Sequence, residues 1–264
     1  MRSITIALTL TFAAISFAAA SKAAPCKVVE FEGVPFSVCT FQAQSENIVL
    51  FLNDEAGEPY GHFEQLASAL AHKKKVLAFA MNAGMYHKDR SPVGLYVEDF
   101  VQSQKANTND GPGNFHLKPN GVFWIGQENG VRSAGVASTE EFLATVPVEV
   151  VRYATQSGPM LVIDGKLHPR FLEDSTSRKR RNGVGVKGNG EVDFVISDGF
   201  VTFHQFARFF RDVLKSENAL FLDGTISRLH APALDRSDRG AKMGPIVGVV
   251  EGLVETKPVN LKKD

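Results

Sequence analysis

Most apolar residues of this chain lie in short runs that are bounded by Gly, Asn, Asp or Pro, a pattern typical of buried strands. Residues 107–114 form a longer interruption that is rich in Asn and Gly. On this basis we predict strands over residues 28–31, 36–41, 47–53, 76–81, 93–97, 122–125, 148–153, 160–163, 183–187, 192–197, 219–222 and 246–250.

A helical period replaces the short runs in two segments, and residues 140–144 add a shorter helix. Over 62–74 the apolar stripe consists of Phe63, Leu66, Ala67 and Leu70. In the second segment the stripe consists of Phe203, Phe206, Ala207, Phe210 and Leu214. Thr202 and Gln205 have the spacing of a capping box at the start of this second helix. Many strands with two or three packed helices predict a single α+β domain with a mixed, mostly antiparallel sheet.

Residues 1–23 have the pattern of an export signal. Arg2 is the only charged residue before the apolar run over 4–20, and small residues suited to cleavage follow it. A membrane anchor is the alternative, but threonine, serine and abundant alanine make the run weak as a stable span. We expect cleavage near residue 23, a periplasmic or secreted protein, and no stable membrane insertion afterwards.

Export affects the interpretation of the two cysteines, because an oxidising compartment favours their pairing. The runs over 28–31 and 36–41 flank Glu32-Gly33, which is suited to a turn. A hairpin centred on that turn places Cys26 opposite Cys39. We therefore predict a structural disulfide between them, with a pair of free structural thiols as the alternative.

Composition narrows the range of functions. The 264 residues fit one large domain or two small ones, and 44% hydrophobic with 22% charged residues excludes general disorder. Equal numbers of basic and acidic residues, 29 of each, leave no net charge to attract nucleic acid or an anionic membrane. The sequence contains no nucleophile elbow, P-loop or H-E-x-x-H motif.

Small and polar residues collect where predicted strands meet turns. Each such pair alone is ordinary turn chemistry, but strand ends at one rim of a sheet also bring polar groups together. Several of these motifs carry Asn, Ser, Arg or Asp, which favours a functional site. They are N-A-G-M-Y at 82–86, G-N-F at 113–115, S-G-P-M-L-V at 157–162, R-N-G-V-G at 181–185 and L-D-G-T-I-S at 222–227.

Four of these motifs carry a family resemblance when they are taken in order with the V-T-F-H-Q-F-A-R-F-F-R-D segment at 201–212: those at 82–86, 157–162, 181–185 and 222–227. Together they resemble the phosphodiester glycosidase family over about 76–250. Residues 24–75 then supply N-terminal strands and a helix, and 251–264 a C-terminal tail. The chain departs from the family pattern at Ala83, at Met85-Tyr86 and at Thr225-Ile226. The residues that fall on family motifs are Asn82, Gly84, Ser157, Gly158, Pro159, Arg181, Gly185, Asp223, Gly224 and Ser227.

The resemblance implies a hydrolase that releases a sugar from a sugar 1-phosphodiester, with a carbohydrate or glycan phosphodiester as its partner. We expect Arg181 to hold the phosphate with its planar guanidinium, and Asp223 to stabilise an oxocarbenium-like centre or activate water. Both should face one cleft. The expected substrate-binding residues, whose glycines allow close approach of a ligand, are Asn82, Gly84, Asn114, Ser157, Gly158, Asn182, Gly224 and Ser227.

Two other functions stay open from sequence. The same cleft would suit a non-catalytic protein that binds cell-envelope glycans. A metal-dependent phosphodiesterase is the second alternative, because clustered Asp and Asn permit a divalent cation, although the sequence requires no cofactor. Asp164 and Asp198 also lie at strand ends, but the sequence favours neither as a second catalytic carboxylate.

Overall fold

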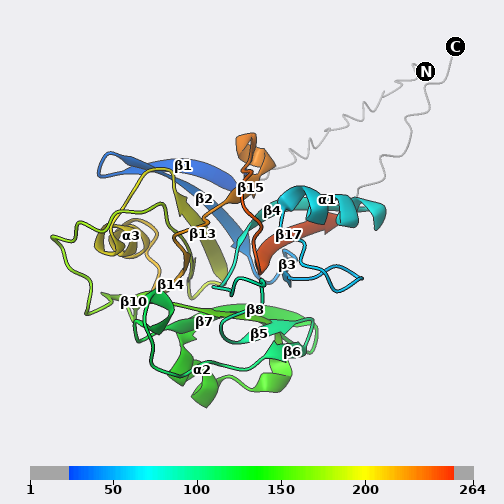
Figure 1. Ribbon diagram of the computed structural model, residues 1–264, viewed down its shortest axis with the longest axis horizontal. Helices are drawn as coiled ribbons and strands as arrows, with labels where there is room; N and C mark the ends of the chain where they lie inside the picture. Colours follow the sequence, from blue (N-terminus) through cyan, green and yellow to red (C-terminus); the bar gives the residue numbers. More distant parts are fainter. Residues whose placement is uncertain (1–23, 253–264) are drawn as a thin grey trace, which may run out of the picture.

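The computed structural model describes residues 24–252 (Figure 1). The expected export signal at 1–23 and residues 253–264 of the expected tail lie outside the described residues. Within 24–252 the strands form three antiparallel sheets of seven, five and five strands. In Figure 1, α3 (Phe203–Arg208) lies beside the first sheet, α1 (Phe63–His72) beside the second and α2 (Thr139–Thr145) beside the third. The predicted α+β class with mostly antiparallel pairing is confirmed.

The first sheet consists, in spatial order, of β1 (Cys26–Phe31), β2 (Val34–Gln42), β13 (Glu191–Ser197), β12 (Asn182–Val186), β14 (Asn218–Asp223), β10 (Met160–Ile163) and β11 (Lys166–Leu167). Its helix α3 begins as expected, because the Thr202 hydroxyl accepts a hydrogen bond from the Gln205 backbone N–H at 3.1 Å. The helix widens into a π-helical turn over Phe209–Val213. Phe209 stacks on Phe36 of β2 at 4.1 Å between ring centroids, which fixes the helix on the sheet.

The second sheet consists of β16 (Arg236–Ser237), β15 (Leu229–Ala231), β4 (Lys75–Asn82), β17 (Ile246–Gly252) and β3 (Ile48–Phe51). Helix α1 packs on it through the buried side chains of Phe63, Leu66 and Leu70, which belong to the predicted apolar stripe. The third sheet consists of β6 (Val101–Gln104), β5 (Tyr96–Glu98), β9 (Val151–Ser157), β7 (Gly121–Glu128) and β8 (Val131–Ser138). Short 3-10 turns occur at Asn114–His116, Val148–Val150 and Pro232–Leu234.

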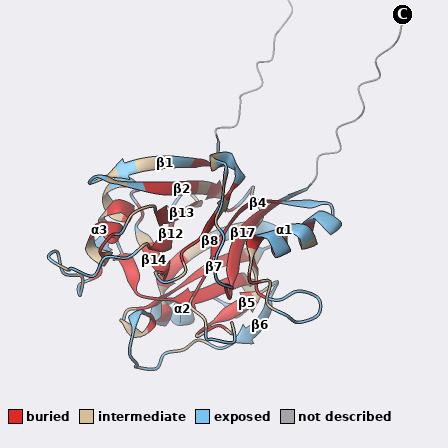
Figure 2. Cartoon of the chain, turned by 45° about the horizontal axis from the view of Figure 1, so that its top comes forward, coloured by how far each residue is buried: buried red, intermediate tan, exposed pale blue. Residues whose placement is uncertain are grey.

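The hydrophobic core lies where the three sheets meet, and Figure 2 shows the strands of this region as buried. Phe79 of the second sheet packs on Phe41 and Phe194 of the first, with ring centroids 5.1 and 5.0 Å apart. Phe123 of the third sheet meets Phe194 edge-on at 5.7 Å. The fold is therefore one domain whose sheets share a single aromatic centre, in place of the one sheet that the strand pattern suggested.

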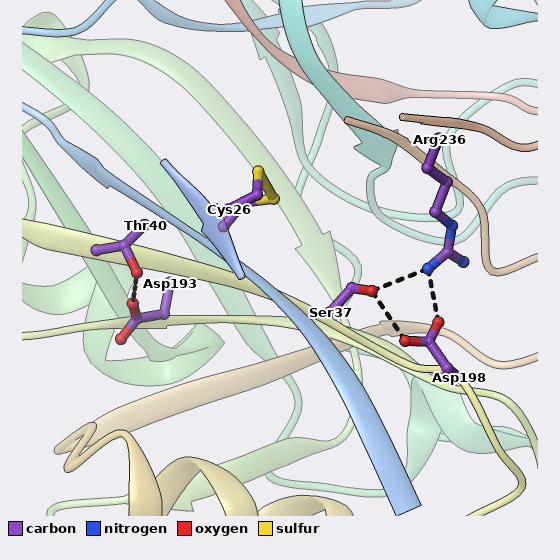
Figure 3. Close-up of a disulfide and its surroundings, with 7 residues drawn as sticks. Cys26, Ser37, Thr40, Asp193, Asp198 and Arg236 are labelled. Atoms are coloured by element: carbon purple, nitrogen blue, oxygen red, sulfur yellow. Dashed lines mark hydrogen bonds and ion pairs between the residues drawn. A yellow bond between two sulfur atoms is a disulfide. The ribbon is translucent and has the colours of Figure 1, made fainter. Parts of the chain in front are cut away.

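The predicted disulfide is confirmed. Cys26 lies directly opposite Cys39 in the β1–β2 hairpin, and their Sγ atoms are bonded (Figure 3). The turn falls on Glu32 and Gly33, whose φ angles of 51° and 73° suit a tight hairpin. None of the helices between residues 24 and 252 is both long enough and apolar enough to cross a membrane.

Candidate functional site

Two asparagines join the first and second sheets where their strands end. Asn82 closes β4 and Asn182 opens β12, and both side chains are fully buried. The Asn182 side-chain amide donates to the Asn82 backbone carbonyl at 2.8 Å. The Asn82 amide donates in return to Asn182 Oδ1 at 3.3 Å. Residues that are a hundred positions apart therefore hold one strand junction together.

The same amides fix the loop that follows β14. Asn182 Oδ1 accepts hydrogen bonds from the Asp223 backbone N–H at 3.0 Å and from the Ser227 hydroxyl at 3.2 Å. Asn82 Oδ1 accepts from the Arg228 backbone N–H at 2.9 Å. The side chains of these predicted substrate-binding residues thus form hydrogen bonds within the protein. They position the 223–228 loop, and a ligand would meet that loop.

Three other residues that we predicted to bind substrate also contribute to the packing of the protein. The Ser157 hydroxyl donates to the Leu222 carbonyl at 2.8 Å. A Cβ atom on Gly84 would lie 2.4 Å from the Gln156 carbonyl oxygen, and one on Gly158 would lie 2.7 Å from the Phe115 carbonyl oxygen. At both glycines neighbouring backbone fills the space that a side chain would take, so packing requires glycine there, and their role in substrate binding stays a prediction.

Asp223 ends β14 with its carboxylate held from one side. Its Oδ1 accepts backbone N–H groups of Gly224 at 2.6 Å and Thr225 at 2.8 Å. Oδ2 makes no hydrogen bond to any residue that the structure describes. Burial raises the pKa of Asp223, and the amide hydrogen bonds oppose this only in part. The result is a desolvated carboxylate with one oxygen left for a ligand.

Asp223 faces a cavity of about 330 Å³, which we call the aspartate cavity. The structure thus brings together three of the residues expected from sequence, Asp223, Gly224 and Asn114. The complete lining is Met85, Tyr86, Val93, Asn114, Asp223, Gly224, Thr225 and Ile226. Burial, and secondarily the negative charge of Asp223, raises the pKa of the Tyr86 phenol, so this half-buried ring lies within the field of the carboxylate.

A second cavity, of about 400 Å³, adjoins the first, and we call it the arginine cavity. Gly224, Thr225 and Ile226 line both cavities, so the two cavities meet at this segment. The other lining residues are Arg180, Ser227, Arg228, Asp238, Arg239, Gly240 and Ala241. Sequence reasoning missed Arg228, although it directly follows the L-D-G-T-I-S motif, and it did not single out Arg180.

Arg181 does not reach either cavity, which corrects the expectation that it shares a cleft with Asp223. Its side chain is 1% exposed, and it donates to the carbonyls of Val201 and Ser177, each at 3.0 Å. The guanidinium lies 3.7 Å from the centre of the Phe203 ring, and burial lowers the pKa of Arg181 to about 10. Because side chains alternate along an extended chain, Arg181 points away from the network that Asn182 enters.

The remaining acidic candidates lie outside both cavity linings. Asp164 is exposed in a turn with a φ of 48°, and Asp198 pairs with Arg236 at 2.6 Å. Over residues 24–252, no three His, Cys, Asp or Glu side chains are arranged to hold a metal ion.

Comparison with known proteins gives the family. The family model described as phosphodiester glycosidase matches residues 75–232. The chain is 32% identical over 191 residues to the uncharacterized protein YigE of Escherichia coli K12, and the match covers 72% of each chain.

Two solved structures share the fold. One is the zebrafish N-acetylglucosamine-1-phosphodiester alpha-N-acetylglucosaminidase catalytic domain, auto-inhibited by its pro-peptide, with a TM-score of 0.55 and 13% identity over 85% of this chain and 81% of that one. The other is a hypothetical protein from Synechocystis, with a TM-score of 0.55 and 16% identity over 85% of this chain; the match spans 61% of that longer protein. Since the family model covers more than half of the sequence, the chain belongs to the phosphodiester glycosidase family.

Proposed function

We propose that this protein is an exported hydrolase that releases a sugar from a sugar 1-phosphodiester, with Asp223 as its catalytic carboxylate. The observation that carries the proposal is the geometry of Asp223. Its Oδ1 is fixed by backbone amides, and its Oδ2 is left unbonded by the described residues that line the aspartate cavity. Membership of the phosphodiester glycosidase family supports the reaction class.

The reaction breaks the bond between the anomeric carbon and the phosphate oxygen. The bonding electrons leave with a phosphate monoester, and water supplies hydroxide to the sugar and releases a proton. Because the leaving group is already an anion, it needs little proton donation. The remaining demand is for negative charge beside the developing oxocarbenium ion or for a base that accepts the proton of the attacking water, and an ionised Asp223 meets either demand.

A single catalytic carboxylate is part of the proposal. Asp238 is the other carboxylate among the residues that line the cavities, and it lines the arginine cavity but not the aspartate cavity. Arg236 donates to both of its oxygens, at 3.0 and 2.8 Å. A carboxylate whose oxygens are both engaged by a guanidinium is a poor base, because this pairing favours its ionised form.

Hydrolysis of a panel of sugar 1-phosphodiesters in water enriched in ¹⁸O tests the proposal. The mature protein should release free sugar that carries the label, and chelator should not change the rate. The matched variants are Asp223→Asn, which should lose turnover, and Asp164→Asn, which removes an exposed turn carboxylate and should keep it. Label in the phosphate would instead indicate a phosphodiesterase, and ligand retention without turnover a glycan-binding protein.

A further inference from the structure

We propose that the arginine cavity is the phosphate subsite, in which Arg228 and Arg180 bind the anionic half of the substrate while Arg236 keeps Asp238 from pairing with them. This inference rests on the proposed function for the identity of the substrate. Its evidence is separate, since it comes from charges and contacts that do not involve Asp223.

Arg228 is a buried cation without an acidic partner. Its side chain lines the cavity although the residue is only 6% exposed. One Nη2 hydrogen bond goes to the Ala241 carbonyl. No ion pair within 24–252 involves Arg228, and the other nitrogen atoms of its guanidinium donate to no described residue. Burial lowers the pKa of Arg228, and the nearby Tyr86, Asp238 and Glu64 oppose this only in part.

The backbone around Arg228 is built to hold this guanidinium. The Arg228 N–H is fixed by Asn82 Oδ1, and the facing residue is Gly240. A Cβ atom on Gly240 would lie 3.0 Å from Nη2, and the φ of 144° is one that side-chain-bearing residues rarely adopt. Arg180, half-buried on the same cavity, also makes no ion pair with any described residue. Two arginines without an ion pair to any described residue therefore line one cavity.

Asp238 is the negatively charged residue in the lining of this cavity, and it forms an ion pair with Arg236. Nε of Arg236 donates to Asp238 Oδ1 at 3.0 Å and Nη2 to Oδ2 at 2.8 Å. Figure 3 shows the other side of the same guanidinium, where Nη1 contacts Asp198 at 2.6 Å and Ser37 at 3.0 Å. Arg236 is thereby anchored to the first sheet. Asp238 stays with Arg236, and the cavity arginines stay available to an anion.

The two neighbouring cavities match the two halves of a sugar 1-phosphodiester. A phosphate in the arginine cavity would lie beside the Gly224–Ile226 segment, which also lines the cavity that the Asp223 carboxylate faces. Planar guanidinium groups suit phosphate because their N–H donors match its oxygens in pairs. The neutral sugar then takes the aspartate cavity, and the bond to be broken lies over the segment where the two cavities meet.

Binding of inorganic phosphate, measured by calorimetry without substrate, tests the subsite. The wild-type protein should bind phosphate, and Arg228→Met should weaken this at least about tenfold, the loss expected for one charge-assisted hydrogen bond. Arg180→Met should weaken binding in the same direction. Arg178→Met is the control, since this exposed arginine lies two residues away and lines neither cavity. If the buried Arg228 variant does not fold, the half-exposed Arg180 variant decides.

The role of Arg236 has its own test. Arg236→Met should weaken phosphate binding although Arg236 does not line the cavity, because Asp238 becomes free to pair with the cavity arginines. Adding Asp238→Asn should restore the affinity. Thr40→Val is the control: Thr40 bonds to Asp193 at 2.6 Å, so it removes another polar link between β2 and β13 (Figure 3). It should leave phosphate binding unchanged.

The outcomes separate the two proposals. Absence of phosphate binding in the wild type, or wild-type affinity in both Arg228→Met and Arg180→Met, would overturn the phosphate subsite. Failure of the Asp238→Asn rescue would overturn the role of Arg236. Intact, arginine-dependent phosphate binding without hydrolysis of any sugar phosphodiester would instead overturn the proposed catalytic function and leave the subsite standing.

Discussion

Replacing Asp223 with asparagine distinguishes a catalytic role of this residue from a structural role. Asparagine keeps the shape of the side chain, and its Oδ1 can still accept the backbone N–H groups of Gly224 and Thr225. Only the negative charge is lost. If that charge stabilises the transition state or accepts a proton, kcat should fall by about 10²–10⁴-fold, the range found for catalytic groups of this kind.

The same substitution should make the folded protein more stable at neutral pH. Burial raises the pKa of Asp223, so folding disfavours its ionised form. The stability that the protonated group contributes is present below the ordinary Asp value of 3.8 and is lost as the pH rises through the folded-state pKa. We therefore expect Asp223→Asn to be more stable than the wild-type protein at pH 7, with the difference disappearing near pH 3.

Urea unfolding of both proteins at several pH values, beside their turnover of a sugar 1-phosphodiester, measures the two effects together. The acid limb of wild-type kcat should also lie above that of an ordinary aspartate, because the ionised form is the active one. Asp164→Asn should change neither quantity. A variant that is less stable than wild type at pH 7, or one that retains full turnover, would show that Asp223 is a turn residue only.

Three further predictions concern the packing of the fold. Replacing Cys26 and Cys39 with serine should lower the free energy of unfolding by about 3 kcal/mol, the loop-closure value for this 13-residue separation, and urea unfolding measures it. Arg181→Lys should lower the melting temperature through loss of its two carbonyl contacts, yet leave kcat per folded molecule within about twofold, because the guanidinium is outside both cavities. Gly84→Ala should destabilise the protein by about 1–3 kcal/mol through overpacking, whereas Gly188→Ala, which has open space around it, should be neutral by the same thermal assay.

Local chemistry made much of the fold predictable. The hairpin of β1 and β2 was predicted in register from its turn alone, since a two-residue turn fixes which residues oppose each other. Helix α1 was predicted within two residues at each end because its apolar stripe and its burial coincide. Strands such as β8 and β15 were missed, because glycine, polar residues or shortness hide the apolar run. The division into three sheets depends on long-range packing that no local pattern records.

The candidate site was predicted in part for a related reason. Motif position identified Asp223, Gly224 and Asn114, which line one cavity. It could not tell which side of the chain each residue occupies. Arg181 and Arg180 are adjacent in sequence, yet the first is buried against Phe203 and the second lines the arginine cavity. Side chains of neighbouring residues in an extended chain point to opposite sides, so a shift of one residue decides which arginine is buried and which lines the cavity. The sequence around a short strand does not show which side each residue takes.

The site depends on the packing of the sheets as much as on its own residues. Asp223 ends a strand of the first sheet, Arg228 precedes a strand of the second, and Asn114 lies in the loop that leads to β7 of the third. The aromatic cluster of Phe41, Phe79, Phe194 and Phe123 and the Asn82–Asn182 pair set the distances between them. The Asp223 carboxylate and the Arg228 guanidinium, which burial alone would disfavour, are thus held beside the two cavities by contacts that the rest of the fold supplies.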